Sequence, residues 1–284
     1  MTPVLPSKRS RFAFLLRVAV FALMAILGMS IFPVLMMPVA GYFVTAALGT
    51  FAAAAVANAL AMRIYEDGRL AGLGLGWSAA SRRNLLLGMG GGIAAAALVV
   101  LLPMATGEGA YDRVGDGRLH WASVLFVSIV LLFGAVGEEL LFRGYAFQVM
   151  ARNMGRYATI APMAVLFGLA HLNNRNVSAM GLANTVAWGL LLGVAFFRSG
   201  DLWLPIGLHF GWNWTLPMLG VNLSGFTMEV TGHAIHPRVG ALWSGGEYGP
   251  EGSLFTTMAV AALFVYIYKA PVSHQIPWLA GDEA

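Results

Sequence analysis

The sequence predicts an all-α, polytopic membrane protein with about eight transmembrane helices. Its 284 residues are 58% hydrophobic and only 11% charged, and the mean hydropathy is +0.73; soluble domains of this size do not have such a composition. The charges are also unevenly placed, because no Asp, Glu, Lys or Arg occurs between residues 18 and 62. One membrane helix needs about 20 apolar residues, so this run alone is long enough for two.

The first apolar run is predicted to be retained as two spans. Lys8, Arg9 and Arg11 precede it, as in a signal peptide, but the run is too long for a signal-peptide core and no convincing cleavage site follows. Pro33 and Pro38 predict a short turn between the two helices.

Six further spans complete the prediction. The third covers residues 84–107, where Gly88 and the glycines at 90–92 favour close helix packing. The fourth begins at Trp121, and its helical pattern continues to about Arg152. The last four are expected at residues 157–172, 178–197, 202–219 and 253–268.

The basic residues predict the orientation. Eight spans place both termini on one side, and most basic residues fall in loops on that side, Arg143 being counted among them. The opposite loops contain only Arg113, Arg118, Arg175 and Arg238. By the positive-inside rule both termini are cytoplasmic, in a multi-pass protein of the cell (inner) membrane. Arg far outnumbers Lys and Ala is abundant, which indicates a bacterial chain. The net charge of +4 is scattered, so no nucleic-acid partner is predicted.

A few polar residues lie inside the predicted spans. Glu138 and Glu139 are the only acidic residues there, and His171 and His209 are the only histidines. Each intramembrane charge costs roughly 2.5–3.5 kcal/mol near a helix centre, so these residues are candidates for either charge pairing or chemistry. The chain has no cysteine, which excludes thiol nucleophiles and thiolate metal sites.

Helix geometry separates the two glutamates. Glu139 and Arg143 are spaced i,i+4 with the acid first, the favourable order for an ion pair. Glu138 points about 100° away from Glu139, so Arg143 is not expected to neutralise both. Gly134 and Gly137 are predicted to leave space beside Glu138, which suits a general base.

The polar residues are also predicted to lie at similar depths in the membrane. Glu138 and His171 lie at equal sequence distances on either side of a predicted turn at Met154–Gly155, so they come level in an antiparallel hairpin of straight helices. His209 lies about eight residues, or roughly 12 Å, past the predicted turn at Asp201, and Asn213, at i,i+4, shares its helix face. One layer is therefore expected to hold Glu138, His171, His209 and Asn213.

Structural interpretations compete with this hypothesis. A Glu–Arg pair alone is more often structural than catalytic, and a lone intramembrane histidine often only hydrogen-bonds a carbonyl. His233 and His236, spaced HxxH in a loop, are expected to be surface residues rather than metal ligands. The hypothesis of a catalytic site depends on the prediction that all four polar groups lie at the same depth in the membrane.

The residues resemble the CPBP family of intramembrane proteases, which includes CAAX proteases and bacteriocin-processing enzymes related to the type II CAAX prenyl endopeptidase. Three motifs appear in order: EExxxR from Glu138 to Arg143, FxxxH from Phe167 to His171, and HxxxN from His209 to Asn213. The resemblance covers residues 121–220, with a compatible Gly-Pro-Glu-Gly at 249–252. We therefore expect weakly family-like spans in residues 1–110 and a catalytic core in residues 111–284.

The resemblance implies roles for these residues. Glu138 would activate water with help from His171, while His209 and Asn213 would bind the scissile carbonyl and its oxyanion. Glu139 and Arg143 would be a supporting ion pair. Glu138, His171 and His209 are candidate zinc ligands, and a metal-independent glutamate mechanism remains equally open. HExxH and GxSG motifs are absent.

The predicted function is thus an intramembrane (metallo)endopeptidase, a hydrolase that cleaves a membrane-tethered peptide or protein within the lipid bilayer, as in CAAX-box processing. Two alternatives stay open. One is a proton-coupled transporter, since buried Glu and His are common in transporters. The other is a non-catalytic membrane immunity or scaffold protein. The physiological substrate and the oligomeric state are not predicted.

Overall fold

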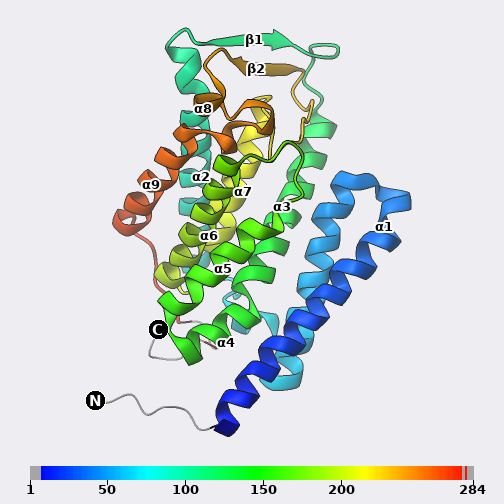
Figure 1. The fold of residues 1–284 in the computed structure, drawn as a ribbon, viewed down its shortest axis with the longest axis vertical. Coiled ribbons are helices and arrows are strands. Elements are labelled where there is room, and N and C mark those ends of the chain that lie inside the picture. The colour runs from blue at the N-terminus through cyan, green and yellow to red at the C-terminus, as the bar shows by residue number, and fades with distance from the viewer. Residues whose placement is uncertain (1–7, 277–278, 280–284) are drawn as a thin grey trace.

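The computed structural model describes residues 8–276 and residue 279, with side chains from residue 12 onward. The side chains of Lys8, Arg9 and Arg11, which precede the first predicted span, lie outside this part. The elements, in chain order, are α1 (Lys8–Tyr65), η1 (Leu70–Leu73), α2 (Ala79–Ala105), β1 (Gly109–Arg113), α3 (Trp121–Arg143), α4 (Tyr145–Met154), α5 (Arg156–Ala170), α6 (Ala179–Ser199), α7 (Trp203–Met218), β2 (His233–Pro237), α8 (Ala241–Ser244), η2 (Gly246–Tyr248), η3 (Pro250–Gly252) and α9 (Leu254–Lys269). The architecture is mainly helical, as predicted (Figure 1).

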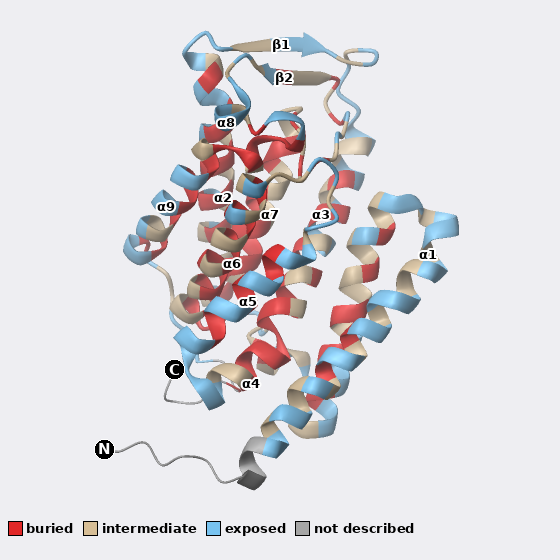
Figure 2. Ribbon diagram, viewed as in Figure 1, coloured by how far each residue is buried: buried red, intermediate tan, exposed pale blue. Residues whose placement is uncertain are grey.

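Apolar helices indicate a membrane protein. Four described segments are long and apolar enough to cross a bilayer: Phe12–Tyr65, Ala79–Ala105, Trp121–Met154 and Ala179–Ser199. Helices α5 and α9 are apolar but shorter. Buried residues gather where α3, α6 and α7 meet, whereas the outer limb of α1 is largely exposed (Figure 2). The expected number of eight spans stays a prediction.

Helix α1 is a hairpin whose turn lies elsewhere than predicted. The reversal is at Gly41, which has a φ of 70°, and the two limbs run side by side in opposite directions (Figure 1). Glycine adopts this left-handed φ without the steric cost that a Cβ would bring. Pro33 and Pro38 both lie inside the helix, and Pro33 packs against Gly49 of the returning limb. The prediction of a turn at the prolines was therefore wrong.

The helix that begins at Trp121 does not continue unbroken to Arg152. It breaks at Gly144, between α3 and α4. Asn58 of α1 spans the break: its amide group donates to Leu140 O (2.9 Å), and its side-chain oxygen accepts the backbone N–H of Tyr145 (2.7 Å). A Cβ at position 144 would lie 2.3 Å from Asn58 Oδ1, so glycine is required there. The straight-helix premise of the depth argument was wrong at this point.

Helix α7 is held against α2 at very short range. A Cβ on Gly88 or Gly92 would lie 2.4 or 2.3 Å from a backbone oxygen of α7. Small residues allow this approach of two backbones inside a membrane protein, which confirms the expected role for Gly88 and Gly92, whereas a Cβ on Gly90 would meet nothing within 4 Å. The contact fixes the helix that carries His209.

A small sheet covers the end of the molecule opposite the α4–α5 turn (Figure 1). Strands β1 and β2 pair antiparallel, with Gly109 opposite Pro237 and Arg113 opposite His233, so the fold is not purely helical. His236 is an exposed residue whose imidazole lies 3.8 Å from Asp112, and its side chain is 62% exposed. The sequence alone gave no sign that these two distant loops would pair.

Candidate active site

Glu139 and Arg143 form a buried ion pair on α3. Arg143 Nη1 donates to Glu139 Oε1 at 3.1 Å, and the side chains are 1% and 0% exposed. The guanidinium also donates to Gly189 O of α6 at 2.9 Å and lies 4.8 Å from the centre of the Phe167 ring. The predicted pair is confirmed, but Arg143 had been counted among the loop cations and is instead part of the helix core.

His209 is joined to the same carboxylate. Its Nδ1 lies 2.9 Å from Glu139 Oε1. A carboxylate that already accepts from Arg143 acts here as an acceptor, so Nδ1 carries the proton and donates it. This leaves Nε2 of His209 facing away from the ion pair. Helix periodicity within α3 could not reveal this link, because the contact joins residues 70 positions apart.

His171 is oriented by its own helix. It caps the C-terminus of α5, and its Nδ1 lies 2.8 Å from the backbone oxygen of Phe167. A carbonyl oxygen only accepts, so Nδ1 of His171 also donates, and its Nε2 is free. The FxxxH spacing therefore has a direct physical meaning, since it lets the histidine hydrogen-bond one turn back.

The two free imidazole nitrogens meet at Glu138. Glu138 Oε2 lies 3.8 Å from His171 Nε2 and 3.7 Å from His209 Nε2. Both distances exceed direct hydrogen bonds, and within the described residues Oε2 has no hydrogen-bond partner. When both histidines are neutral, three lone-pair atoms face one point, an arrangement that requires a shared water, a proton or a cation. The structure thus brings Glu138, His171 and His209 together.

The surroundings of Glu138 differ from expectation in one respect. A Cβ on Gly137 would lie 2.7 Å from the backbone of Phe51, so Gly137 allows α1 to approach rather than leaving space for the glutamate. Space does exist on the opposite side, where the Glu138 side chain is 28% exposed.

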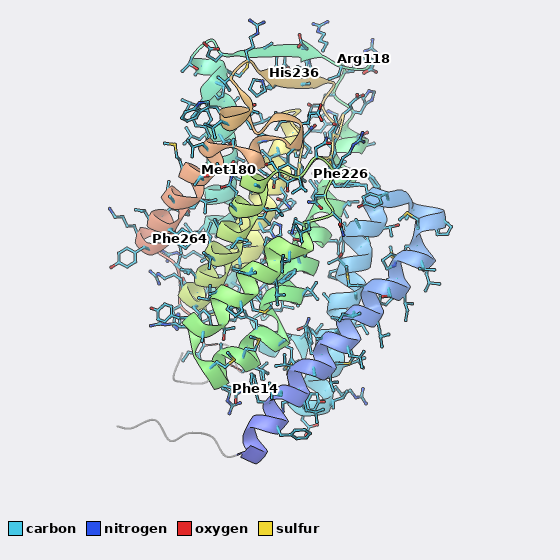
Figure 3. The ribbon with its side chains drawn as sticks, in the orientation of Figure 1. Phe14, Arg118, Met180, Phe226, His236 and Phe264 are labelled. Atoms are coloured by element: carbon cyan, nitrogen blue, oxygen red, sulfur yellow. The ribbon has the colours of Figure 1, made fainter. Side chains whose placement is uncertain are left out.

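Two hollows meet at His171 and Asn213. We call the larger one the cleft; its volume is about 350 Å³, and it lies between the α1 hairpin, α3 and the loop after α7. Glu138, Gly134, Tyr42 and Phe226 line it, and Tyr42 stacks on Phe226, which is labelled in Figure 3, with ring centres 5.6 Å apart. The walls are mainly apolar, and they provide a path to the Glu138 carboxylate.

The smaller hollow, which we call the inner cavity, lies behind the histidines and has a volume of about 30 Å³. It is lined by Phe167, His171, Asn184, Thr185, Trp188, Leu192, His209, Trp212, Asn213, Ser224 and Glu251. Asn213, one turn beyond His209 on α7, lines both hollows, so all four residues of the expected layer border this region.

Glu251 is a residue that we had placed in a loop and assigned no role. It sits on η3, where Asn184 of α6 fixes the turn by donating to Glu251 O (2.8 Å) and Ser253 O (2.9 Å). Its carboxylate accepts from the backbone N–H and hydroxyl group of Ser224. Burial raises the pKa of the Glu251 carboxyl. The Gly-Pro-Glu-Gly stretch was the only sequence signal for this position.

The donor set has the chemistry of a catalytic zinc site but not its arrangement. Two imidazole nitrogens and one carboxylate are known zinc ligands, and Phe167 O and Glu139 orient the imidazoles as outer partners do. Among the described residues, however, no group of three His, Asp or Glu side chains is placed to hold a metal ion. We therefore derive no reaction step through a metal.

Comparison with known proteins finds a family match over the central helices. The family model described as type II CAAX prenyl endopeptidase Rce1-like matches residues 120–215, about a third of the chain, and the match includes all three motifs. No curated protein and no solved structure matches the chain. The resemblance predicted from the motifs is confirmed for this segment, which is similar to the type II CAAX prenyl endopeptidase Rce1-like family.

Proposed function

We propose that the protein is an intramembrane endopeptidase that hydrolyses a peptide bond of a membrane-tethered substrate, with Glu138 as general base. The observation that carries the proposal is the approach of His171 Nε2 and His209 Nε2 to one oxygen of Glu138, at 3.8 and 3.7 Å. One water placed against these three atoms would be held by a base and two ring nitrogens beside the cleft. Activation of that water is the chemistry that a protease requires.

The proposed reaction follows from the positions of these groups. Glu138 takes one proton from the water, His171 Nε2 accepts a hydrogen bond from the remaining O–H, and the water oxygen bonds to the scissile carbonyl carbon. Asn213 donates to the resulting oxyanion, as does His209 from Nε2 when it is protonated. The carbon–nitrogen bond then breaks, and Glu138 returns its proton to the leaving nitrogen. Glu139 and Arg143 keep His209 in position.

We propose that the site lies within the bilayer. Glu138 is in the middle of the candidate span Trp121–Met154, in a multi-pass protein of about eight spans whose termini are cytoplasmic. Residues 111–284 would form the catalytic core, while residues 1–110 contribute α1 as one wall of the cleft. The apolar cleft suits a substrate anchored by a lipid or a membrane helix, as in CAAX-type processing.

The test compares cleavage by purified protein in lipid nanodiscs. Membrane-anchored peptides ending in CAAX sequences, with and without a prenyl group, are incubated with wild type, Glu138→Gln, and the exposed control Glu108→Gln. We expect Glu138→Gln to lose about 10²- to 10⁴-fold in kcat and the control to retain it. Unchanged cleavage by Glu138→Gln would overturn the assignment.

Two further measurements separate the alternatives. The zinc content of active protein, and its activity after chelation, distinguishes a metal-dependent reaction from a glutamate protease. A wild-type protein that folds, cleaves no membrane peptide and carries solute into vesicles would instead support the transporter, and absence of both activities would support a scaffold.

A further inference from the structure

We propose that the inner cavity is a water site that supplies the hydrolytic water to Glu138 from the side opposite the substrate. This inference rests on the proposed function and adds to it a ligand, water, and two positioning residues, Trp212 and Glu251. The reason for such a site is physical. A substrate that fills an apolar cleft excludes bulk water from the base, while hydrolysis still consumes one water per turnover.

The cavity has the size of a water site. A water needs roughly 10–15 Å³ of such volume, and the inner cavity has about 30 Å³. One or two waters fit, whereas a peptide side chain does not. The substrate therefore belongs in the cleft, whose volume is about ten times larger.

The cavity also offers the polar partners that a buried water needs. Trp188 and Trp212 line it and are 7% and 2% exposed. In the described part of the structure neither Nε1 has a hydrogen-bond partner, although buried indole N–H groups usually find one. Two such donors on residues that line a small polar cavity point to an acceptor that fills it.

Glu251 supplies the opposite kind of group. Ser224 occupies its Oε2 from both the backbone N–H and the hydroxyl group, which fixes the carboxyl at the wall of the cavity. The indole N–H of Trp212 lies close enough to this carboxyl to lower its pKa as a donor, although no hydrogen bond of good geometry joins them. A water in the cavity beside both groups would accept from Trp212 and donate to Glu251, and would satisfy both groups.

The position of the cavity explains how water could reach the base. His171, Asn213 and Ser224 line both hollows and so form the partition between them. Trp212 and Glu251 line only the inner cavity, and Glu138 lines only the cleft. Water leaving the inner cavity passes the imidazoles and arrives at Glu138 without crossing the substrate.

The first experiment detects the water without using activity. Radiolytic hydroxyl-radical footprinting of the intact protein in nanodiscs labels side chains beside bound water, with buried Phe196, which does not line the cavity, as the internal reference. We expect modification of Trp212 and Trp188 despite their burial, and loss of that modification in Glu251→Leu. Labelling of both tryptophans as low as that of Phe196, after correction for intrinsic reactivity, would overturn the proposal even if the protein is an active protease.

The second experiment tests whether this water is used. Trp212→Phe keeps the ring and removes the donor, while Trp214→Phe makes the same change on the same helix at a residue whose Nε1 bonds Ser128 instead. We expect Trp212→Phe to lower kcat roughly fivefold with KM unchanged, and Trp214→Phe to leave kcat unchanged. Equal kcat values for Trp212→Phe and wild type would show a stored water that the reaction does not use, and would overturn the supply role.

Discussion

Two faces of helix α3 place adjacent glutamates in opposite environments. On the bundle face, Glu139 is fully buried and bonds both Arg143 and His209. On the cleft face, Glu138 is 28% exposed, and its nearest cationic or imidazole atoms lie beyond hydrogen-bonding distance. Neighbouring residues of a helix point about 100° apart, so a single step along the chain moves a carboxylate from a packed interface to an open cleft.

The difference teaches how this chain accommodates two carboxylates in an apolar region. The charge of Glu139 is tolerated because the fold fixes its partners, and those partners position His209. Glu138 lacks such partners and is left able to exchange a proton. We therefore expect substitutions on the bundle face to reduce stability, and substitutions on the cleft face to reduce activity.

The largest effect on stability is expected for Glu139→Gln. Removing this charge leaves the buried Arg143 guanidinium uncompensated, and breaking a buried ion pair costs about 3–5 kcal/mol. The matched change Glu138→Gln, at the neighbouring position, should alter the free energy of unfolding by less than about 0.5 kcal/mol. Unfolding of the purified proteins in SDS-containing mixed micelles, followed by circular dichroism, measures both values.

Equal losses of stability in the two variants would contradict the proposed difference between the two faces. Unfolding of Glu139→Gln like wild type would also contradict it, since the ion pair would then contribute nothing to the fold. Retention of stability by Glu138→Gln is required in any case, because only a folded variant can report on catalysis.

The sequence predicted the parts of this site that are local. The i,i+4 spacings of Glu139 with Arg143 and His209 with Asn213 follow from helix geometry alone, and so does the separation of the two glutamates. The helix order was also predictable, because long apolar segments are a strong signal.

The parts that the sequence missed depend on distant residues. The break at Gly144 is stabilised by Asn58, a residue 87 positions away from its partner Tyr145, and the link from His209 to Glu139 spans 70 positions. Glu251 appeared to be one loop acid among many, since its place beside the inner cavity depends on Asn184 and Ser224. The reversal at Gly41 was missed because the prolines nearby were the stronger turn signal.

The next largest effect is expected at Asn58. Asn58→Ala leaves the buried N–H of Tyr145 and the oxygen of Leu140 without their partner, and should cost roughly 3 kcal/mol. Asn213→Ala is the matched substitution on the cleft side, where the Asn213 side chain lines the cleft and makes no hydrogen bond to another described residue. It should reduce cleavage and leave the unfolding transition in place. Reversed effects, with stability lost at Asn213 and activity at Asn58, would contradict the division between the faces.

A smaller loss is expected at the contact between α1 and α3. A Cβ on Gly137 would lie 2.7 Å from the Phe51 backbone, whereas a Cβ on Gly134 would meet Ala47 at an ordinary 3.4 Å. Gly137→Ala should therefore cost about 2 kcal/mol through overpacking, and Gly134→Ala less than about 0.5 kcal/mol. The same SDS titrations give both values, and equal losses would mean that α1 does not pack on α3 at this distance.

The smallest effect is expected where α3 contacts α7 away from both faces. Ser128 accepts a hydrogen bond from Trp214 Nε1 at 2.8 Å, so Ser128→Ala should reduce the free energy of unfolding by about 1 kcal/mol. Cleavage should not change, because neither residue borders the cleft or the inner cavity. If Ser128→Ala instead lowers kcat as much as Trp212→Phe does, then a small shift of α7 is sufficient to disturb His209. The two faces of α3 would then not act independently, and the loss in Trp212→Phe would report the position of the helix rather than a missing water.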